Sequence, residues 1–268
     1  MNFQVASDIH IEKLYPKLSD IEDFIIPVEG IENLILAGDI GSIYQIDCFK
    51  HFFLSCKRIF KNVLYVPGNN EYYLREGFEM KTKKDLDNDL EKLCQEIGIL
   101  LLNNAYIELE NIIIFGSTWW SHVPDILNIR INIDKNRKMN SDDFNHFHTQ
   151  SRRSLNWILE QNITKKKKVL VISHYCPTKI GTMNGHHRRE DFIDLIPYYF
   201  SASEKFLKKD LVDTWIFGHT HVFRDFYFDQ NQTRIISNAD PRKKFFRRNF
   251  VLEFPSFRNS LTLENEDE

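Results

Sequence analysis

Short, mostly apolar runs recur along the chain, and polar residues or glycine bound each of them. Runs of this length are typical of strands that are covered on both faces of a sheet. We therefore predict buried strands at residues 3–6, 34–37, 63–66, 99–102, 112–115, 169–172 and 214–217.

Segments with helical spacing separate several of these strands. Residues 43–60, 79–97 and 149–161 each carry apolar side chains three and four positions apart, which places them on one face of a helix. The alternation of strands and helices predicts an α/β protein.

The last third of the chain has a different pattern. Residues 222–228, 232–237 and 249–254 resemble successive strands, so we expect a second, partly antiparallel sheet there. No repeat or linker interrupts the chain, which predicts a single domain over residues 1–258. Residues 259–268 are acidic and poor in apolar side chains, and we expect them to be frayed.

Composition excludes broad classes of protein. Of the 268 residues, 42% are hydrophobic, which is enough for a globular core, and the net charge of −3 requires neither nucleic acid nor a membrane as partner. No apolar run reaches the length of about 18–20 residues that spans a bilayer, and no signal peptide is present, so we expect a soluble cytoplasmic protein. The 4 cysteines form no CxxC pair, which argues against a thiolate zinc site.

Polar clusters follow five of the predicted strands, at the point where each strand ends. Ligands bind outside the carboxyl ends of strands in open α/β sheets, so we expect these clusters to converge. They contain two carboxylates, one carboxamide and four imidazoles that could bind metal: Asp8, Asp39, Asn69, His10, His174, His219 and His221.

This mixture of oxygen and nitrogen donors without thiolate suits Mn, Fe or Zn. Seven ligands are too many for one ion, whereas two ions that share a bridging carboxylate would use them all. The chemistry suited to such a pair is in-line displacement at phosphorus by a metal-bound hydroxide. The sequence therefore predicts a hydrolytic phosphoesterase with two divalent metal ions.

The ordered set of motifs resembles the signature of the calcineurin-like metallophosphoesterases, over residues 3 to about 222. The motifs are Asp8-x-His10, Gly38-Asp39, Gly68-Asn69-x-Glu71, His174 and Gly218-His219-x-His221. The resemblance implies a four-layer α/β-β/α sandwich, in which two facing mixed sheets are flanked by helices. Residues 115–120 and the Asn238-x-x-Pro241-Arg242 turn further resemble small bacterial-type cytosolic members.

The resemblance also implies how the ligands are shared between two ions. The first ion would be bound by Asp8, His10, Asp39 and His221, and the second by Asp39, Asn69, His174 and His219. Asp39 would be the bridge. Asp39 and His174, together with the residue at position 70, are the predicted catalytic residues.

Asn70 departs from the family pattern, which usually has histidine at this position to protonate the leaving oxygen or to position the phosphate. A carboxamide can donate a hydrogen bond but cannot deliver a proton, and loss of a general acid typically costs about two to four powers of ten in rate. Three hypotheses follow: an engineered substrate-trapping form, a natural enzyme for anhydrides or other good leaving groups, or a metal-binding pseudo-enzyme. Because every metal ligand is retained, we favour the first.

Further residues are candidates for binding a phosphorylated small molecule or nucleotide. Besides Asn70, we expect contacts from His148, His187, Arg188 and Arg242. The basic and aromatic stretch 242–248 leaves open a nucleic-acid phosphodiesterase, which we favour less. A non-catalytic scaffold that binds a protein through residues 192–206 or 222–228 is the other alternative.

Overall fold

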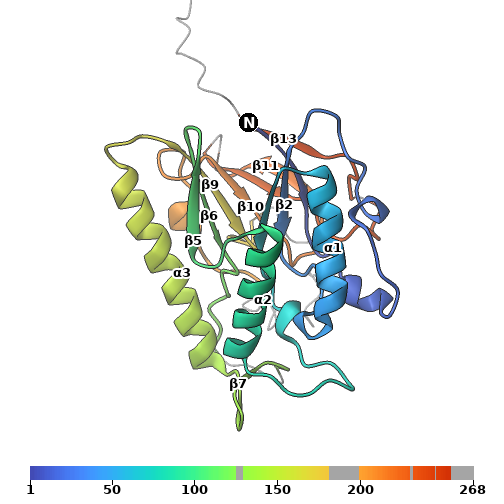
Figure 1. Ribbon diagram of the computed structural model, residues 1–268. Helices are drawn as coiled ribbons and strands as arrows, with labels where there is room; N and C mark the ends of the chain where they lie inside the picture. The colour runs from blue at the N-terminus through green and yellow to red at the C-terminus, as the bar shows by residue number, and fades with distance from the viewer. Residues whose placement is uncertain (125–128, 181–198, 230–231, 245, 255–268) are drawn as a thin grey trace, which may run out of the picture.

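The computed structural model describes residues 1–124, 129–180, 199–229, 232–244 and 246–254. Two mixed sheets face each other, and helices cover their outer faces (Figure 1). The predicted contacts of His187 and Arg188 and the acidic tail lie outside the described residues.

The first sheet has the strand order β13-β1-β2-β3-β4. Its strands β1, β2, β3 and β4 are parallel, and β13 runs antiparallel to β1. Their bounds are β1 Asn2–Ala6, β2 Asn33–Ala37, β3 Asn62–Val66, β4 Leu100–Leu101 and β13 Val251–Glu253.

The second sheet has the order β11-β12-β10-β9-β6-β5. Its central strands β12, β10, β9 and β6 are parallel, and the edge strands β11 and β5 are antiparallel to their neighbours. The bounds are β5 Ala105–Leu109, β6 Ile112–Ser117, β9 Lys168–Ser173, β10 Thr214–Ile216, β11 Arg224–Tyr227 and β12 Arg234–Ser237. A separate hairpin joins β7 (Asn132–Asp134) to β8 (Arg137–Lys138).

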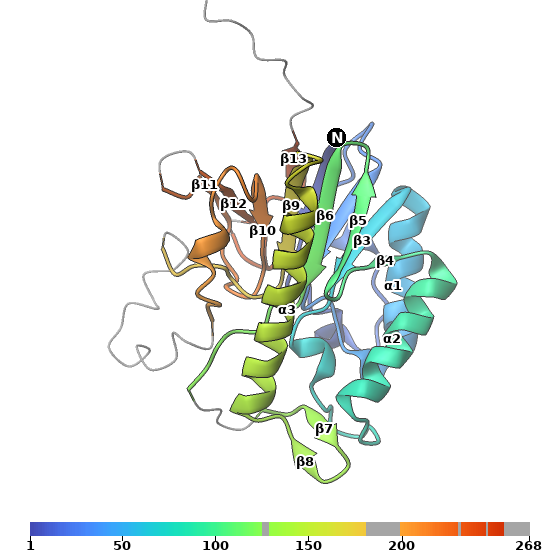
Figure 2. The same ribbon diagram turned by 90° about the vertical axis from the view of Figure 1, so that its left-hand side faces the viewer.

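Three apolar clusters connect the layers. One lies between the first sheet and the helices α1 and α2, one lies between the two sheets, and the third lies between the second sheet and α3. Figure 2 shows α1 and α2 beside the first sheet and α3 over the second. The helices are α1 Ile46–Ile59, α2 Lys83–Ile97 and α3 Ser141–Asn162, and the short 3₁₀ helices are η1 Ile11–Leu14, η2 Ile21–Asp23, η3 Ile43–Gln45, η4 Asn70–Tyr72 and η7 Glu204–Phe206.

Adjacent residues of a strand contribute to different clusters, because side chains alternate across a sheet. In β2, Leu34 and Leu36 face the helices, whereas Ile35 faces the second sheet. This explains the continuous apolar runs in the sequence. Among the helices that the structure describes, none combines the length and hydrophobicity needed to cross a bilayer.

The structure differs from the sequence-based expectation in the partner of one strand and in the start of one helix, and it adds the edge strand β5. The last predicted strand, β13, does not join the second sheet but pairs with β1 in the first. Helix α3 begins at Ser141 rather than at 149, because Asn140 and Asp143 form a capping box that starts it ahead of its apolar stripe.

Candidate metal centre

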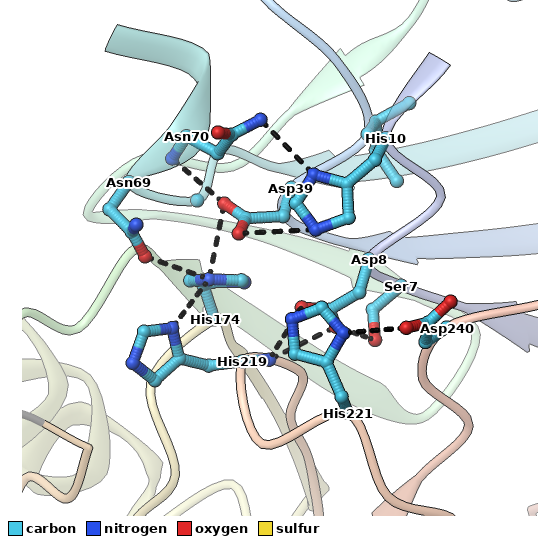
Figure 3. Close-up of polar contacts among 12 residues, drawn as sticks. Ser7, Asp8, His10, Asp39, Asn69, Asn70, His174, His219, His221 and Asp240 are labelled. Atoms are coloured by element: carbon cyan, nitrogen blue, oxygen red, sulfur yellow. Dashed lines mark hydrogen bonds and ion pairs between the residues drawn. The ribbon is translucent and has the colours of Figure 1, made fainter. Parts of the chain in front are cut away.

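The polar clusters predicted at the strand ends do converge. The loops that follow β1, β2, β3, β9 and β10 bring the seven predicted ligands into one group (Figure 3). Among the described residues, potential ligand atoms form two sets, and within each set the atoms lie within 4.8 Å of one another. The first set is Asp8, His10 and His221, and the second is Asp39, His174 and His219. We call these the first and second clusters.

The loops that carry these residues adopt an unusual backbone. Five of the seven predicted ligands have positive φ angles: Asp8 (54°), His10 (56°), Asp39 (52°), His219 (65°) and His221 (53°). Side chains other than glycine rarely adopt this conformation, and such strain of about 1–3 kcal/mol per residue persists where the surrounding structure imposes it. The concentration of strained residues at one place indicates a functional site.

Glycines permit the loops to approach one another. A side chain at Gly38, whose φ is 85°, would collide with the ring of His174. One at Gly68 would collide with the carboxylate and backbone of Asp39. The glycines that precede Asp39 and Asn69 therefore permit close packing of the three loops.

The second cluster is centred on one imidazole nitrogen. His174 Nε2 lies 3.2 Å from Asp39 Oδ1, 3.1 Å from Asn69 Oδ1 and 3.2 Å from His219 Nδ1 (Figure 3). Asn69 is oriented by its own amide, which donates to the Tyr73 hydroxyl at 2.8 Å. Four potential ligands from four loops therefore surround one point.

The first cluster lies on the other side of Asp39. His221 Nε2 is 3.3 Å from Asp8 Oδ1, and the rings of His221 and His10 stack with their centroids 5.4 Å apart. The second carboxylate oxygen of Asp39, Oδ2, faces His10 Nε2 at 3.9 Å. The two oxygens of Asp39 thus face the two clusters.

The donor atoms fit divalent metal ions. His10 Nε2 is buried and has no hydrogen-bond partner among the residues that the structure describes, although it faces Asp39. An unpaired buried polar atom is costly, and a metal ion would satisfy it. Imidazole, carboxylate and carboxamide donors together suit Mn, Fe or Zn.

Outer partners orient the histidine rings. The Nδ1 atom of His10 lies 3.0 Å from Glu12 Oε1, and that of His221 lies 2.9 Å from Asp240 Oδ2. His174 Nδ1 instead faces the carbonyl oxygen of Ala37 at 3.1 Å. Such contacts fix the tautomer that leaves the other ring nitrogen free for a metal.

Glu71, the last residue of the third motif, holds two loops together. Its buried carboxylate accepts hydrogen bonds from the backbone N–H groups of Asp39, Ile40 and Gly68. It also accepts one from the Tyr65 hydroxyl at 2.9 Å. Glu71 therefore positions Asp39 without belonging to either cluster.

The predicted catalytic position, Asn70, has a charged partner at each end of its amide. Nδ2 donates to Glu12 Oε1 at 2.9 Å and lies 3.2 Å from His10 Nδ1. Oδ1 accepts from Arg75 Nη2 at 2.8 Å, and the backbone N–H donates to Asp39 Oδ1. The carboxamide thus links the metal ligands to Arg75.

The charge of Asp39 sets the protonation of the second cluster. Burial disfavours the carboxylate, but the charge and hydrogen bond of His174 outweigh it and hold the pKa of Asp39 well below its ordinary value. Burial likewise disfavours the imidazolium of His174, but Asp39 raises the pKa of that ring to about 9.

A cleft of about 470 Å³ opens over both clusters. Besides ligand side chains, its walls include Lys13 and Lys243 on one side. Tyr73 and Tyr199 also line it, and the ring of Tyr199 lies 5.2 Å from that of His219. The cleft can accommodate an anionic group with an adjoining flat or apolar part.

Two predicted substrate contacts, His148 and Arg242, have protein partners of their own in the structure. The prediction for His148 is wrong: this residue is 1% exposed, its Nδ1 pairs with the Trp120 carbonyl oxygen at 2.7 Å, and burial lowers its pKa to about 4. It belongs to the packing around Trp119 and Trp120. Arg242 lies near the centre, but its Nε donates to Asp240 Oδ1 at 2.7 Å, which makes it a support for the His221 partner.

The arginines of the basic stretch 242–248 have internal partners. Arg247 lies over the Phe223 ring at 4.0 Å, and Arg248 donates to the carbonyl oxygens of Glu22, Asp23 and Phe24. These contacts weigh against a nucleic-acid surface, because the cations stabilise the fold instead.

Several residues of the centre escaped the sequence analysis. Glu12 follows His10 by two positions. Asp240 lies in the 238–242 turn, where the sequence pattern predicts a role only for Arg242. Arg75 carried no signal in the sequence. Their roles arise from contacts across loops that local patterns do not record.

Comparison with known proteins indicates the family. The family model described as calcineurin-like phosphoesterase matches residues 1–223. An uncharacterized protein of Acanthamoeba polyphaga mimivirus is 28% identical over 247 residues, which cover 84% of this chain and 86% of that protein.

Two solved structures share the fold. A phosphopantetheinyl hydrolase from Mycobacterium tuberculosis superposes with a TM-score of 0.63 at 14% identity, over 90% of each chain. A dimetal phosphatase from Danio rerio superposes with a TM-score of 0.52 at 13% identity, over 90% of this chain and 88% of the other. The predicted fold of two mixed sheets with flanking helices is therefore confirmed.

Proposed function

The chain belongs to the calcineurin-like phosphoesterase family, and from this membership we propose that it hydrolyses phosphate esters with two divalent metal ions in the cleft. The observation that carries the proposal is Asp39, whose two carboxylate oxygens face the two ligand clusters at 3.2 Å and 3.9 Å. A carboxylate in this position suits a bridge between two ions.

The proposed ligands divide as the family resemblance implies. Asp8, His10 and His221 would bind the first ion, and Asn69, His174 and His219 the second, with Asp39 shared. When bound, such ions neutralise charge on phosphoryl oxygens and activate water as a nucleophile. We favour Mn, Fe or Zn for their affinity for imidazole and carboxylate.

The protein's own residues have distinct tasks in this proposal. Lys13 and Lys243 attract the anionic substrate into the cleft, and Glu12 and Asp240 orient the rings of His10 and His221. The amide of Asn70 donates a hydrogen bond to Glu12 but cannot deliver a proton to a leaving group.

Asn70 bears on which hypothesis we now favour. Because its amide has a carboxylate partner at the nitrogen and a guanidinium partner at the oxygen, the surrounding residues complement asparagine. This supports a natural enzyme for substrates with good leaving groups over an engineered form.

Metal analysis tests the proposal. Protein purified without chelators should contain about two ions of Mn, Fe or Zn per chain. It should hydrolyse p-nitrophenyl phosphate, lose this activity with EDTA and regain it with Mn²⁺. Elemental analysis that finds no stoichiometric metal, and no activity after addition of metal, would contradict the proposal.

Asn70→His tests the role of the position. A histidine can donate a proton, so we expect faster turnover of a phosphomonoester or phosphodiester, and the largest gain with a poor leaving group. An unchanged rate for a poor leaving group would mean that position 70 does not serve the leaving oxygen.

A further inference from the structure

A second cavity, of about 410 Å³, is lined by Arg75, whose guanidinium contacts Asn70 at the metal centre. It lies between the loop that follows η4 and the β7–β8 hairpin. The backbone N–H of Leu74 donates to the Arg130 carbonyl oxygen at 2.9 Å, and Thr82 pairs with Asn132. These contacts hold the hairpin against the loop that leads into α2 (Figure 2).

The cavity has a positive lining. Its charged side chains are Arg75, Arg130 and Lys138 against a single acid, Glu76. Within the ranges that the structure covers, neither Arg130 nor Lys138 has an ion-pair partner. Three cations around one cavity, two of them without an ion-pair partner among the described residues, form a site for a compact anion such as phosphate.

Arg75 connects this cavity to the metal centre. Its Nη2 atom donates to Asn70 Oδ1 at 2.8 Å and to the Asn70 carbonyl oxygen at 3.3 Å, while its side chain lines the cavity. A substrate group that leaves past Asn70 therefore moves toward these cations.

The chemistry at Asn70 limits which groups can leave. An alkoxide is a strong base and needs a proton as its bond to phosphorus breaks, but a carboxamide cannot give one and arginine does not lose its proton in proteins. A leaving phosphate needs none, because its second pKa lies near about 6 and it departs as an anion.

Resting on the proposed function, we propose that the substrate is a phosphoanhydride, and that the cavity of Arg75, Arg130 and Lys138 binds its departing phosphate. The oxygen of water forms a bond to one phosphorus, and the bond from that phosphorus to the bridging oxygen breaks. The electron pair remains on the bridging oxygen as charge of the leaving phosphate; one proton of the water passes to solvent and the other stays on the newly formed phosphate.

Three substrates separate this inference from the proposed function. ADP contains an anhydride, p-nitrophenyl phosphate is an ester with a good leaving group and no second phosphate, and glycerol 2-phosphate has an alkoxide leaving group. With Mn²⁺-loaded protein, we expect kcat/KM for ADP to exceed that for glycerol 2-phosphate by at least about 100-fold, the cost of a missing general acid.

A double variant tests the cavity. Arg130→Gln with Lys138→Gln should lower the ratio of kcat/KM for ADP to that for p-nitrophenyl phosphate by at least about tenfold, because two contacts to the second phosphate are lost. The matched control is Lys135→Gln, in the turn of the same hairpin but outside the cavity, which should change the ratio by less than about twofold.

Binding provides a second readout. Calorimetry with α,β-methylene-ADP, in which carbon replaces the bridging oxygen, should show at least about tenfold weaker binding to the double variant, but not to the Lys135→Gln control. Equal binding and an unchanged ratio would overturn the inference, as would equal rates for ADP and glycerol 2-phosphate. Absence of metal-dependent turnover of all three substrates would instead refute the proposed function, and the inference with it.

Discussion

The two ligand clusters differ in what holds their histidines. In the first cluster, His10 and His221 are each held by a carboxylate, at 3.0 Å from Glu12 and 2.9 Å from Asp240. The His221 side chain is 34% exposed. A carboxylate partner makes an imidazole a stronger base and a better metal ligand.

In the second cluster, His174 is fully buried and faces a backbone carbonyl oxygen at the end of β2. Its charge partner is Asp39, which both clusters share. The first cluster therefore depends on the charges of buried carboxylates, whereas the second depends on the backbone of the sheet. Substitutions can therefore perturb one site without the other, except at Asp39.

The side chains that line the cleft also differ between the two clusters. Lys13 lies in η1, three residues after His10 of the first cluster. The backbone N–H of Lys243 donates to the carbonyl oxygen of Asp240. Tyr73 and Tyr199 instead contact Asn69 and His219 of the second site. We expect the charge of the substrate to lie near the first cluster and its less polar part near the tyrosines.

The largest effect should come from removing the shared residue. Asp39→Ala removes the carboxylate between the clusters, so we expect both ions to be lost together and hydrolysis to fall by at least about 1,000-fold. Elemental analysis and the p-nitrophenyl phosphate assay measure the two effects. Asp210→Ala, at an exposed aspartate, is the control. Retention of one tightly bound ion by Asp39→Ala would show that the residue is no bridge.

The next effect should be confined to the first cluster. Asp240→Asn keeps a side chain beside His221 but removes its charge, and loss of such a partner typically weakens metal binding by about 10- to 100-fold. Metal titration should then resolve one weakened ion and one unchanged ion. Asp225→Asn removes a carboxylate on β11 that pairs with Arg234 of β12, and it should leave both ions unaffected. Equal weakening of both ions would mean that the clusters are not separable.

The second cluster should respond to pH through His174. In the metal-free protein, Asp39 raises the pKa of this imidazole to about 9, so the ring is protonated at neutral pH and must lose its proton to bind metal. Metal affinity should therefore rise by up to about tenfold per pH unit as pH increases toward 9, and level off above it.

Calorimetry in buffers of different ionisation enthalpy measures the released proton directly. His51→Gln, at a half-buried histidine paired with Asp20 outside both clusters, should not change the slope. The same raised pKa stabilises the metal-free fold fully below the ordinary value of about 6.5, and this contribution is lost as pH rises through 9. An affinity for metal that does not change with pH would exclude a protonated His174 in the metal-free protein.

The smallest effect concerns the cationic wall. Lys13→Gln or Lys243→Gln should each raise KM for p-nitrophenyl phosphate by about two- to fivefold at low salt, and the effect should shrink near about 0.5 M salt, where charges are screened. Lys244→Gln is the matched control, since Lys244 adjoins Lys243 but does not line the cleft. A change in KM that is insensitive to salt would mean that the lysines act by packing and not by charge.

Local pattern in the sequence was sufficient for much of the fold. The predicted strand 3–6 lies within β1, and 63–66 within β3, because strands buried on both faces leave continuous apolar runs. The half-exposed edge strand β5 carries no such run and was missed. The partner of β13 also depends on where the chain returns after β12, which no short segment encodes.

For the candidate site, local sequence pattern was enough to predict the kinds of ligand and their location at the strand ends. It was enough because polar side chains that interrupt apolar runs mark where a strand leaves the core. Only the tertiary structure decided that Asp240 supports His221, that Arg75 joins Asn70 to a cationic cavity, and that His148 is buried in the core. These contacts depend on how loops from separate strands pack against one another, and spacing along the chain does not record that packing.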